Sequence, residues 1–248
     1  MKNGPYSGKR IEFDINPQPD DTTCGPTCLR AVYQYFGDDV DLTSIANDIT
    51  SLNHGGTLAV CLGIHALNRK YRCQIYTYNL EIFDPTWFVL SRKQIVDKLT
   101  ARLEFTQSPR RILALQAYRN FLQLGGKIHM KDLRASVIRK FLSKGVPIIT
   151  GLSSTYLYQT FREIPETCAD DDIRGEPSGH FVVVTGYDPV SRNVEVADPW
   201  IEHPFGPGLN YKVSFDRLIN SILLGVITYD ANLLIIEPQP DHHNPSDA

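Results

Sequence analysis

Cys24 is the residue of this sequence best placed to act as a nucleophile. It follows a polar turn at residues 20–23 and begins the segment CGPTCLRAVYQYFG, whose apolar residues recur at helical spacing. A cysteine attacks a carbonyl as the thiolate, and the unpaired amides and macrodipole of a helix N-terminus favour that anion. A free cysteine is more often a small buried apolar residue, so Cys24 taken alone supports both interpretations.

Cys28 lies one helical turn further on, and its position predicts a different role. It falls on the apolar stripe with Val32 and Tyr35, which is typical of a core residue. A metal site formed by Cys24 and Cys28 would need a second pair of cysteine or histidine ligands at matching spacing, and none supports it. We therefore expect neither a metal ion nor a cofactor.

His180 and Asp198 could act with Cys24 in nucleophilic catalysis. His180 begins the predicted strand HFVVVTGYD, and Asp198 ends the predicted strand NVEVADP. If the two strands pair as a hairpin through the turn at residues 189–193, both side chains reach the same end of the sheet. The carboxylate can then accept a hydrogen bond from the imidazole and fix its tautomer. Alone, each residue is more simply a loop histidine or a turn-forming aspartate.

Gln18 lies six residues before Cys24, on the approach to the polar turn. Its side-chain amide and the backbone N–H of Cys24 could together donate to a developing oxyanion. The alternative is a solvated glutamine between Pro17 and Pro19.

Substrate contacts are expected around these residues. Gly25 has no side chain to obstruct an approaching substrate. The acidic loop at 165–178 has two interpretations: a lid or subsite wall that favours a basic or amine-bearing substrate, or a solvated loop without a role in binding. The residues expected to contact substrate are Gly25, Gly179, Tyr156 and Trp200, although Trp200 could equally belong to the core.

The elements that must position these residues change in type along the chain. Apolar spacing, caps and glycine stops predict helices first, at 24–36, 44–48, 58–71, 91–105, 108–125 and 133–144. Strands are predicted mainly later, at 73–80, 146–153, 180–188, 193–199 and 232–238, with a further helix near 215–223. This order indicates an α+β fold with a mostly antiparallel sheet.

Composition narrows the functional classes. The chain has 248 residues, of which 42% are hydrophobic, and a net charge of −3 with scattered basic residues, so neither nucleic acid nor an anionic membrane is expected as a partner. No apolar run is long enough to span a bilayer, and the N-terminus lacks a secretory signal. Five cysteines, an odd number, are interpreted as reduced thiols in a cytoplasmic protein.

The chain is interpreted as one domain over residues 1–237, with a helical insertion at about 90–144. The proline-rich tail at 238–248 is expected to be disordered. Its His242–His243 pair is interpreted as solvated rather than as a metal site.

The motifs Gln18-Pro-Asp-Asp-Thr-Thr-Cys24-Gly25, His180-Phe-Val-Val-Val and Asp198-Pro199 occur in this order. Together they resemble the papain-like superfamily of cysteine peptidases, and most closely the double-glycine (bacteriocin-processing) peptidases and their stand-alone relatives. The resemblance implies that Cys24 is the nucleophile, His180 the base, Asp198 the orienting acid and Gln18 the oxyanion donor. It also implies a helical layer carrying the nucleophile on a central helix, packed on a C-terminal sheet.

The function implied is a cysteine hydrolase that cleaves a peptide or isopeptide amide bond through a thioester, with a peptide or peptide-like substrate. Two alternatives remain. An acyltransferase would use the same thioester and deliver the acyl group to an amine. A non-hydrolytic peptide-binding module would keep the fold without the reaction, and the presence of both Cys24 and His180 argues against it.

Overall fold

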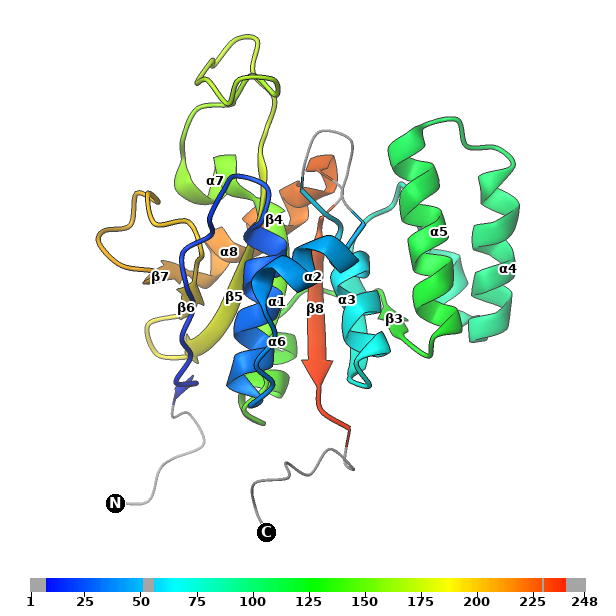
Figure 1. Ribbon diagram of the computed structural model, residues 1–248, viewed down its shortest axis with the longest axis horizontal. Coiled ribbons are helices and arrows are strands. Elements are labelled where there is room, and N and C mark those ends of the chain that lie inside the picture. Colours follow the sequence, from blue (N-terminus) through cyan, green and yellow to red (C-terminus); the bar gives the residue numbers. More distant parts are fainter. Residues whose placement is uncertain (1–7, 51–55, 229, 240–248) are drawn as a thin grey trace.

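The computed structural model describes residues 8–50, 56–228 and 230–239, and a mixed β-sheet with helices on both faces lies at its centre (Figure 1). The sheet order is β3-β2-β8-β4-β5-β6-β7, and β1 pairs with β5 beyond the end of β4. The strands are β1 (Lys9–Arg10), β2 (Arg72–Thr77), β3 (Lys127–His129), β4 (Ile148–Ser153), β5 (Gly179–Asp188), β6 (Asn193–Ala197), β7 (Asn210–Ser214) and β8 (Asn232–Glu237). The β2–β3 pair is parallel and the other pairs are antiparallel, so the predicted α+β class is confirmed.

The helices cover the two faces of this sheet. They are α1 (Cys24–Tyr35), α2 (Leu42–Asp48), α3 (Ala59–Asn68), α4 (Arg92–Leu103), α5 (Pro109–Gln123), α6 (Ala135–Leu142), α7 (Ser154–Tyr158) and α8 (Phe215–Leu224), with 3-10 turns η1 (Pro85–Val89) and η2 (Gly225–Thr228). Residues paired across neighbouring strands point to the same face of a sheet. The register therefore assigns each helix to a face.

One face packs against α1 and α3. Ile149 is paired with both Leu234 and Val183, which places these three side chains in one row. Gly63 of α3 lies against this row, because a Cβ added to it would be 3.3 Å from Leu234 Cδ1. Phe181 is two residues before Val183 and lies against Gly25 of α1. The helix that carries the candidate nucleophile is thus packed directly on β5.

The opposite face packs against α6 and α8. Tyr76 of β2 lies on this face, and its ring is 5.9 Å from that of Phe141 on α6. Gly225, at the end of α8, is in contact with the backbone of Leu152 on β4. Ile138 and Phe141 are fully or almost fully buried. The segment at about 90–144 is therefore not helical throughout: β3 extends the sheet and α6 packs on it, whereas α4 and α5 lie to one side (Figure 1).

Local sequence signals correspond closely to the observed elements. The predicted capping box is present, since Ser91 Oγ accepts from the Gln94 backbone and Gln94 Oε1 accepts from the Ser91 backbone. The predicted hairpin is also present as the β5–β6 pair. The elements α7, β1, β3 and β7 were not expected, because each has five residues or fewer. The strands β1 and β3 pair with strands far away in the sequence, whereas β7 pairs with β6 across an irregular loop. The His242–His243 pair lies outside the described residues.

Candidate active site

Cys24 is the first residue of α1, as the sequence predicts. Thr23, the N-cap residue, makes no side-chain hydrogen bond to the helix, and the first turn contains no acidic residue. The amides of this turn are therefore free of side-chain acceptors, and they favour negative charge at the thiol. The Cys24 residue is buried but still accessible to solvent, with an exposed fraction of 7%.

His180 lies near the start of β5 and bridges Cys24 and Asp198. Its Nε2 is 2.8 Å from Asp198 Oδ1. Burial lowers the pKa of His180, but the charge and hydrogen bond of Asp198, followed by the hydrogen bond and charge of Cys24, outweigh this and raise the pKa to about 10. Because Nε2 faces Asp198, Nδ1 is the ring nitrogen left to face the thiol. The three side chains therefore form one chain of polar contacts.

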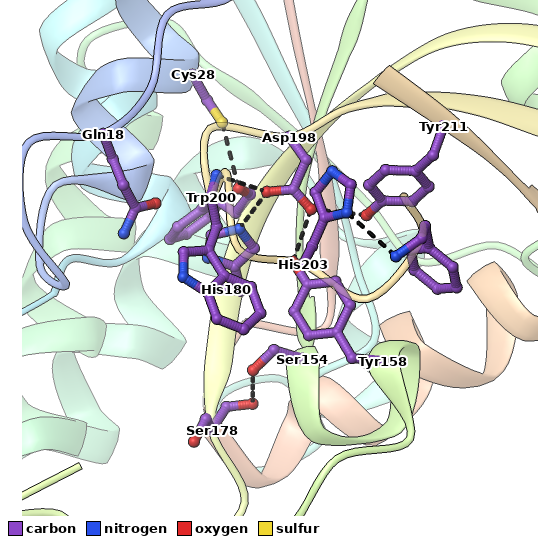
Figure 2. A network of polar contacts seen from close by, with 12 residues as sticks. Gln18, Cys28, Ser154, Tyr158, Ser178, His180, Asp198, Trp200, His203 and Tyr211 are labelled. Atoms are coloured by element: carbon purple, nitrogen blue, oxygen red, sulfur yellow. Dashed lines mark hydrogen bonds and ion pairs between the residues drawn. The ribbon is translucent and has the colours of Figure 1, made fainter. Parts of the chain in front are cut away.

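Asp198 is completely buried, and both of its oxygens accept hydrogen bonds (Figure 2). Oδ1 accepts from His180 Nε2 and from the Trp200 backbone N–H at 2.9 Å. Oδ2 accepts from the hydroxyls of Tyr158 at 2.6 Å and Tyr211 at 2.7 Å. Burial alone would raise the pKa of Asp198, but the His180 charge and these hydrogen bonds lower it overall. Asp198 is thus an ionised carboxylate in a buried site.

Tyr158 and Tyr211 are site residues that the sequence did not reveal. They come from α7 and β7, two short elements that were not expected. Burial, followed by the charge of Asp198, raises the pKa of each phenol well above its ordinary value, so both remain protonated donors. The alternation of Tyr211 and Val213 within NYKVS is a weak strand signal that could have located β7.

Gln18 lies beside this group but is oriented differently from the expected oxyanion donor. Its backbone N–H donates to Pro199 O at 2.8 Å, which ties it to the segment after Asp198. Its Nε2 donates to Asp20 O at 2.9 Å. The Oε1 atom is buried without a hydrogen-bond partner and lies on the side of His180 (Figure 2). A half-turn of the amide would exchange the two atoms and direct an N–H donor toward that side.

The four residues expected to contact substrate have different surroundings. Gly25 is buried, and a Cβ on it would lie 2.8 Å from Thr57 Cγ2 and 3.3 Å from Phe181 Cδ2. The structure therefore gives a packing reason for this glycine rather than room for a substrate. Gly179 is exposed next to His180, although a Cβ there would be 2.8 Å from Thr228 Oγ1.

Tyr156 is a residue of α7, and Trp200 packs against Tyr158 of the same helix. Tyr156 lines a cavity of about 340 Å³ together with Arg162, Leu224 and Ile227. Trp200 packs on Tyr158, with ring centroids 5.0 Å apart, and donates its backbone N–H to Asp198. Trp200 therefore supports the carboxylate.

The acidic loop forms an arm that extends beyond α7 (Figure 1). Glu163 exchanges backbone hydrogen bonds with Glu176 near the base of the arm. Burial, followed by the charges of Asp21 and Glu163, raises the pKa of Cys168 near the tip. The arm and the turn that precedes Cys24 are thus close enough to interact electrostatically.

Cys28 is a core residue, as its position on the apolar stripe predicts. Its side chain has no exposed area, and its thiol donates to Phe181 O at 3.3 Å. Burial, followed by the charges of Cys24 and Asp198, raises the pKa of Cys28 well above its ordinary value. Cys28 is therefore a thiol that does not ionise. In the part of the chain that the structure describes, no three histidine, cysteine or acidic side chains are grouped to hold a metal ion.

A helix that presents a cysteine to a histidine on one strand and to an aspartate directly after the neighbouring strand of a mostly antiparallel sheet is the arrangement of papain-like cysteine peptidases. The chain belongs to the Peptidase C39-like family, whose sequence profile matches residues 10–206. This confirms the resemblance inferred from the motifs. A search of curated proteins finds no significant match.

One solved structure supports the fold, and two others are similar to this chain at lower scores. A C39-like peptidase from Bacillus anthracis, described as putative in its own report, is 15% identical, with a TM-score of 0.52 over 93% of this chain and 98% of that one. The double-glycine motif protease of an AMS/PCAT transporter, solved with its leader peptide, is 12% identical over 93% of this chain and 95% of that one, with a TM-score of 0.45. Xylellain, a cysteine protease from Xylella fastidiosa, is 12% identical over 94% of this chain and 86% of that one, with a TM-score of 0.44. The Bacillus anthracis structure shows the shared fold, and nothing further about this chain is concluded from the other two structures, whose TM-scores are below 0.5. No helix in residues 8–50, 56–228 and 230–239 has the length and hydropathy of a membrane span.

Proposed function

We propose that this protein cleaves a peptide or isopeptide amide bond through a thioester formed on Cys24. The observation that supports this most is the polar chain from Asp198 through His180 to Cys24, in which the imidazole has a raised pKa and contacts both neighbours. A protonated imidazole next to a thiol stabilises the thiolate, which is the nucleophilic form.

The proposed reaction proceeds in two steps. The Cys24 thiolate attacks the carbonyl carbon, a C–S bond forms, and the C–N bond breaks as His180 gives its proton to the leaving amine. A water molecule then attacks the thioester while neutral His180 takes its proton. The carboxylic acid is released, and the thiolate–imidazolium pair is restored.

The developing oxyanion needs donors in this reaction. The backbone N–H of Cys24 at the start of α1 is one candidate, and the Gln18 amide is the other. We propose that the Gln18 amide rotates by a half-turn, so that its N–H group takes the position of the buried, unpartnered Oε1. The N–H can then donate to the oxyanion, and the position no longer holds a buried polar atom without a partner.

The experiment is mass spectrometry of the products from a defined peptide library, with and without added primary amines. Hydrolysis predicts free carboxylates with or without amine, and an acyltransferase predicts amide adducts that require the amine. The Cys24→Ala protein should release neither product, and Cys28→Ala should retain turnover as a matched control. Complete absence of turnover by the purified wild-type protein across the library, with Cys24 shown to be reduced, would contradict the proposal.

A further inference from the structure

Two tyrosine hydroxyls converge on the one oxygen of Asp198 that does not face His180. Tyr158 Oη and Tyr211 Oη donate to Asp198 Oδ2 at 2.6 Å and 2.7 Å (Figure 2). One tyrosine comes from α7 and the other from β7, so elements far apart in the sequence supply the pair. Together with His180 and the Trp200 backbone, they give the carboxylate four donors. Such a complete set fixes both the charge and the rotation of the carboxyl group.

The need for these donors follows from burial. Asp198 has no exposed area and His180 is 8% exposed, so water stabilises neither charge well. In such surroundings a carboxylate can be neutralised by taking the proton of its imidazolium partner. Hydrogen bonds to the charged form oppose this transfer and are stronger than those between neutral groups. Two phenols that do not ionise can supply them without adding a charge.

The rings that carry the hydroxyls are themselves held in place. The Tyr158 ring packs on Trp200, with centroids 5.0 Å apart, and the Tyr211 ring packs on Phe205 and His203, with centroids 4.5 Å from each. Aromatic packing of this kind fixes the direction of each hydroxyl. The two hydroxyls are therefore preorganised on Oδ2.

We propose that Tyr158 and Tyr211 are positioning residues that keep Asp198 a carboxylate and direct its other oxygen at His180, and this rests on the proposed function. Without the two hydroxyls, Asp198 takes up a proton at a higher pH. A neutral Asp198 no longer stabilises the His180 imidazolium, and the Cys24 thiolate is lost with it. The two tyrosines thus determine the lowest pH at which the Cys24 thiolate is still present.

The groups that titrate or carry charge around Asp198 come from each element packed against it. They are Cys24 and Cys28 on α1, Tyr158 on α7, His180 on β5, Tyr211 on β7, and His203 in the loop before β7. The test must therefore separate the tyrosine hydroxyls from the histidines and thiols, which a change from tyrosine to phenylalanine does.

The experiment measures the rate at which iodoacetamide alkylates Cys24 as a function of pH, with the modified site identified by mass spectrometry. The variants are Tyr158→Phe, Tyr211→Phe and the double variant. Tyr35→Phe is the matched control, because Tyr35 donates to Gly145 O and lies outside the site. Alkylation needs no substrate, so it reports on the thiolate directly, and thermal unfolding checks that each variant is folded.

We expect the acid limb of the alkylation profile to move to higher pH in each single variant. In the double variant it should move by about one pH unit or more, which is roughly a tenfold loss of rate at a fixed pH on that limb. Near neutral pH the alkylation rates of the folded single variants should differ less from wild type than they do on the acid limb. The profile of Tyr35→Phe should superimpose on that of wild type at every pH.

Profiles that superimpose on wild type, or that fall equally at every pH, would overturn the inference and leave the two tyrosines a structural role. If the double variant does not fold, the two single variants decide in the same way. A wild-type Cys24 that reacts no faster than the exposed Cys168 would instead contradict the proposed function.

Discussion

The charge state of each active-site residue depends on its neighbour. Asp198 remains ionised although it is buried, because four donors surround it, and its charge raises the pKa of His180. His180 in turn contacts Cys24, which lies among the amides of a helix N-terminus. Any change to one of these residues should therefore alter the pH dependence of the others.

The first prediction concerns the basic limb of activity. The pKa of His180 is raised from 6.5 to about 10, so the imidazolium is present throughout the neutral range and is lost as pH rises through about 10. Peptide turnover, measured as kcat/KM against pH, should fall along this limb. Asp198→Asn removes the charge that raises the pKa, so its basic limb should begin at a lower pH. An unchanged basic limb in Asp198→Asn would contradict the coupling.

The same shift affects stability with a definite sign. Because the folded pKa of His180 is above its unfolded value, its contribution to the free energy of unfolding is fully present below about pH 6.5 and is lost as pH rises through about 10. For Asp198, whose pKa is lowered, the contribution is present above its ordinary value of 3.8 and is lost as pH falls through the folded pKa.

Three of the site residues could be predicted from the sequence because they lie at the ends of helices and strands that the local sequence pattern predicts. Cys24 is at a helix start, and His180 and Asp198 are at the ends of two strands joined by a short turn. Tyr158 and Tyr211 could not be predicted, because their role exists only after α7 and β7 reach the same carboxylate.

At the scale of elements, close packing of α3 against α5 and β8 depends on a glycine. A Cβ on Gly63 would lie 2.8 Å from Phe121 Cε2 and 3.3 Å from Leu234 Cδ1, and both of these side chains are fully buried. The α4–α5 pair is thus attached to the sheet layers partly through this contact.

The second prediction is that Gly63→Ala destabilises the protein. Overpacking costs about 1–3 kcal/mol, and over most of this range the cost is larger than the roughly 1 kcal/mol that alanine gains over glycine in a helix. Urea unfolding should show a lower midpoint. Phe121→Leu makes room for the added methyl group, so the double variant should be more stable than the sum of the two single changes predicts. Strict additivity would show that the two positions do not compete for space.

Long elements were predicted well and short ones poorly. The strands β4, β5, β6 and β8 have continuous or alternating apolar residues, and the capping box at Ser91 sets the start of α4. The β-strand β3 has three residues and pairs in parallel with β2, a pairing that no local pattern encodes. The division of residues 90–144 between the core layers and the α4–α5 pair depends on the same long-range contacts.

At the scale of the whole molecule, a second buried carboxyl lies away from the Asp198 network. Asp230, just before β8, is 6% exposed, and its Oδ1 accepts from the Ala59 backbone N–H at 3.4 Å. Burial raises its pKa to about 7, against the opposing charge of Arg110. A Cβ on Gly151 would lie 2.6 Å from Asp230 Cβ, so the carboxyl is held closely between β4 and the start of α3.

The third prediction follows from the sign of this shift. The folded protein holds the Asp230 proton more tightly than the unfolded chain, so stability falls as pH rises from about 4 to about 7. Asp230→Asn keeps an oxygen acceptor and removes the titration. The Tm of Asp230→Asn relative to wild type should therefore increase between pH 5 and pH 8. Asp97→Asn, on an exposed position of α4, is the control and should show a constant difference.

The central claim is that Cys24 is the nucleophile, and the most direct measurement is peptide turnover by Cys24→Ala and Cys28→Ala proteins. Both thiols lie on α1, but only Cys24 contacts His180 in the described structure. We predict that Cys24→Ala remains folded and loses at least about 10³-fold in kcat/KM, because no other group can form the thioester. Cys28→Ala should retain turnover. Turnover by a pure, folded Cys24→Ala protein at a rate near wild type would contradict the account.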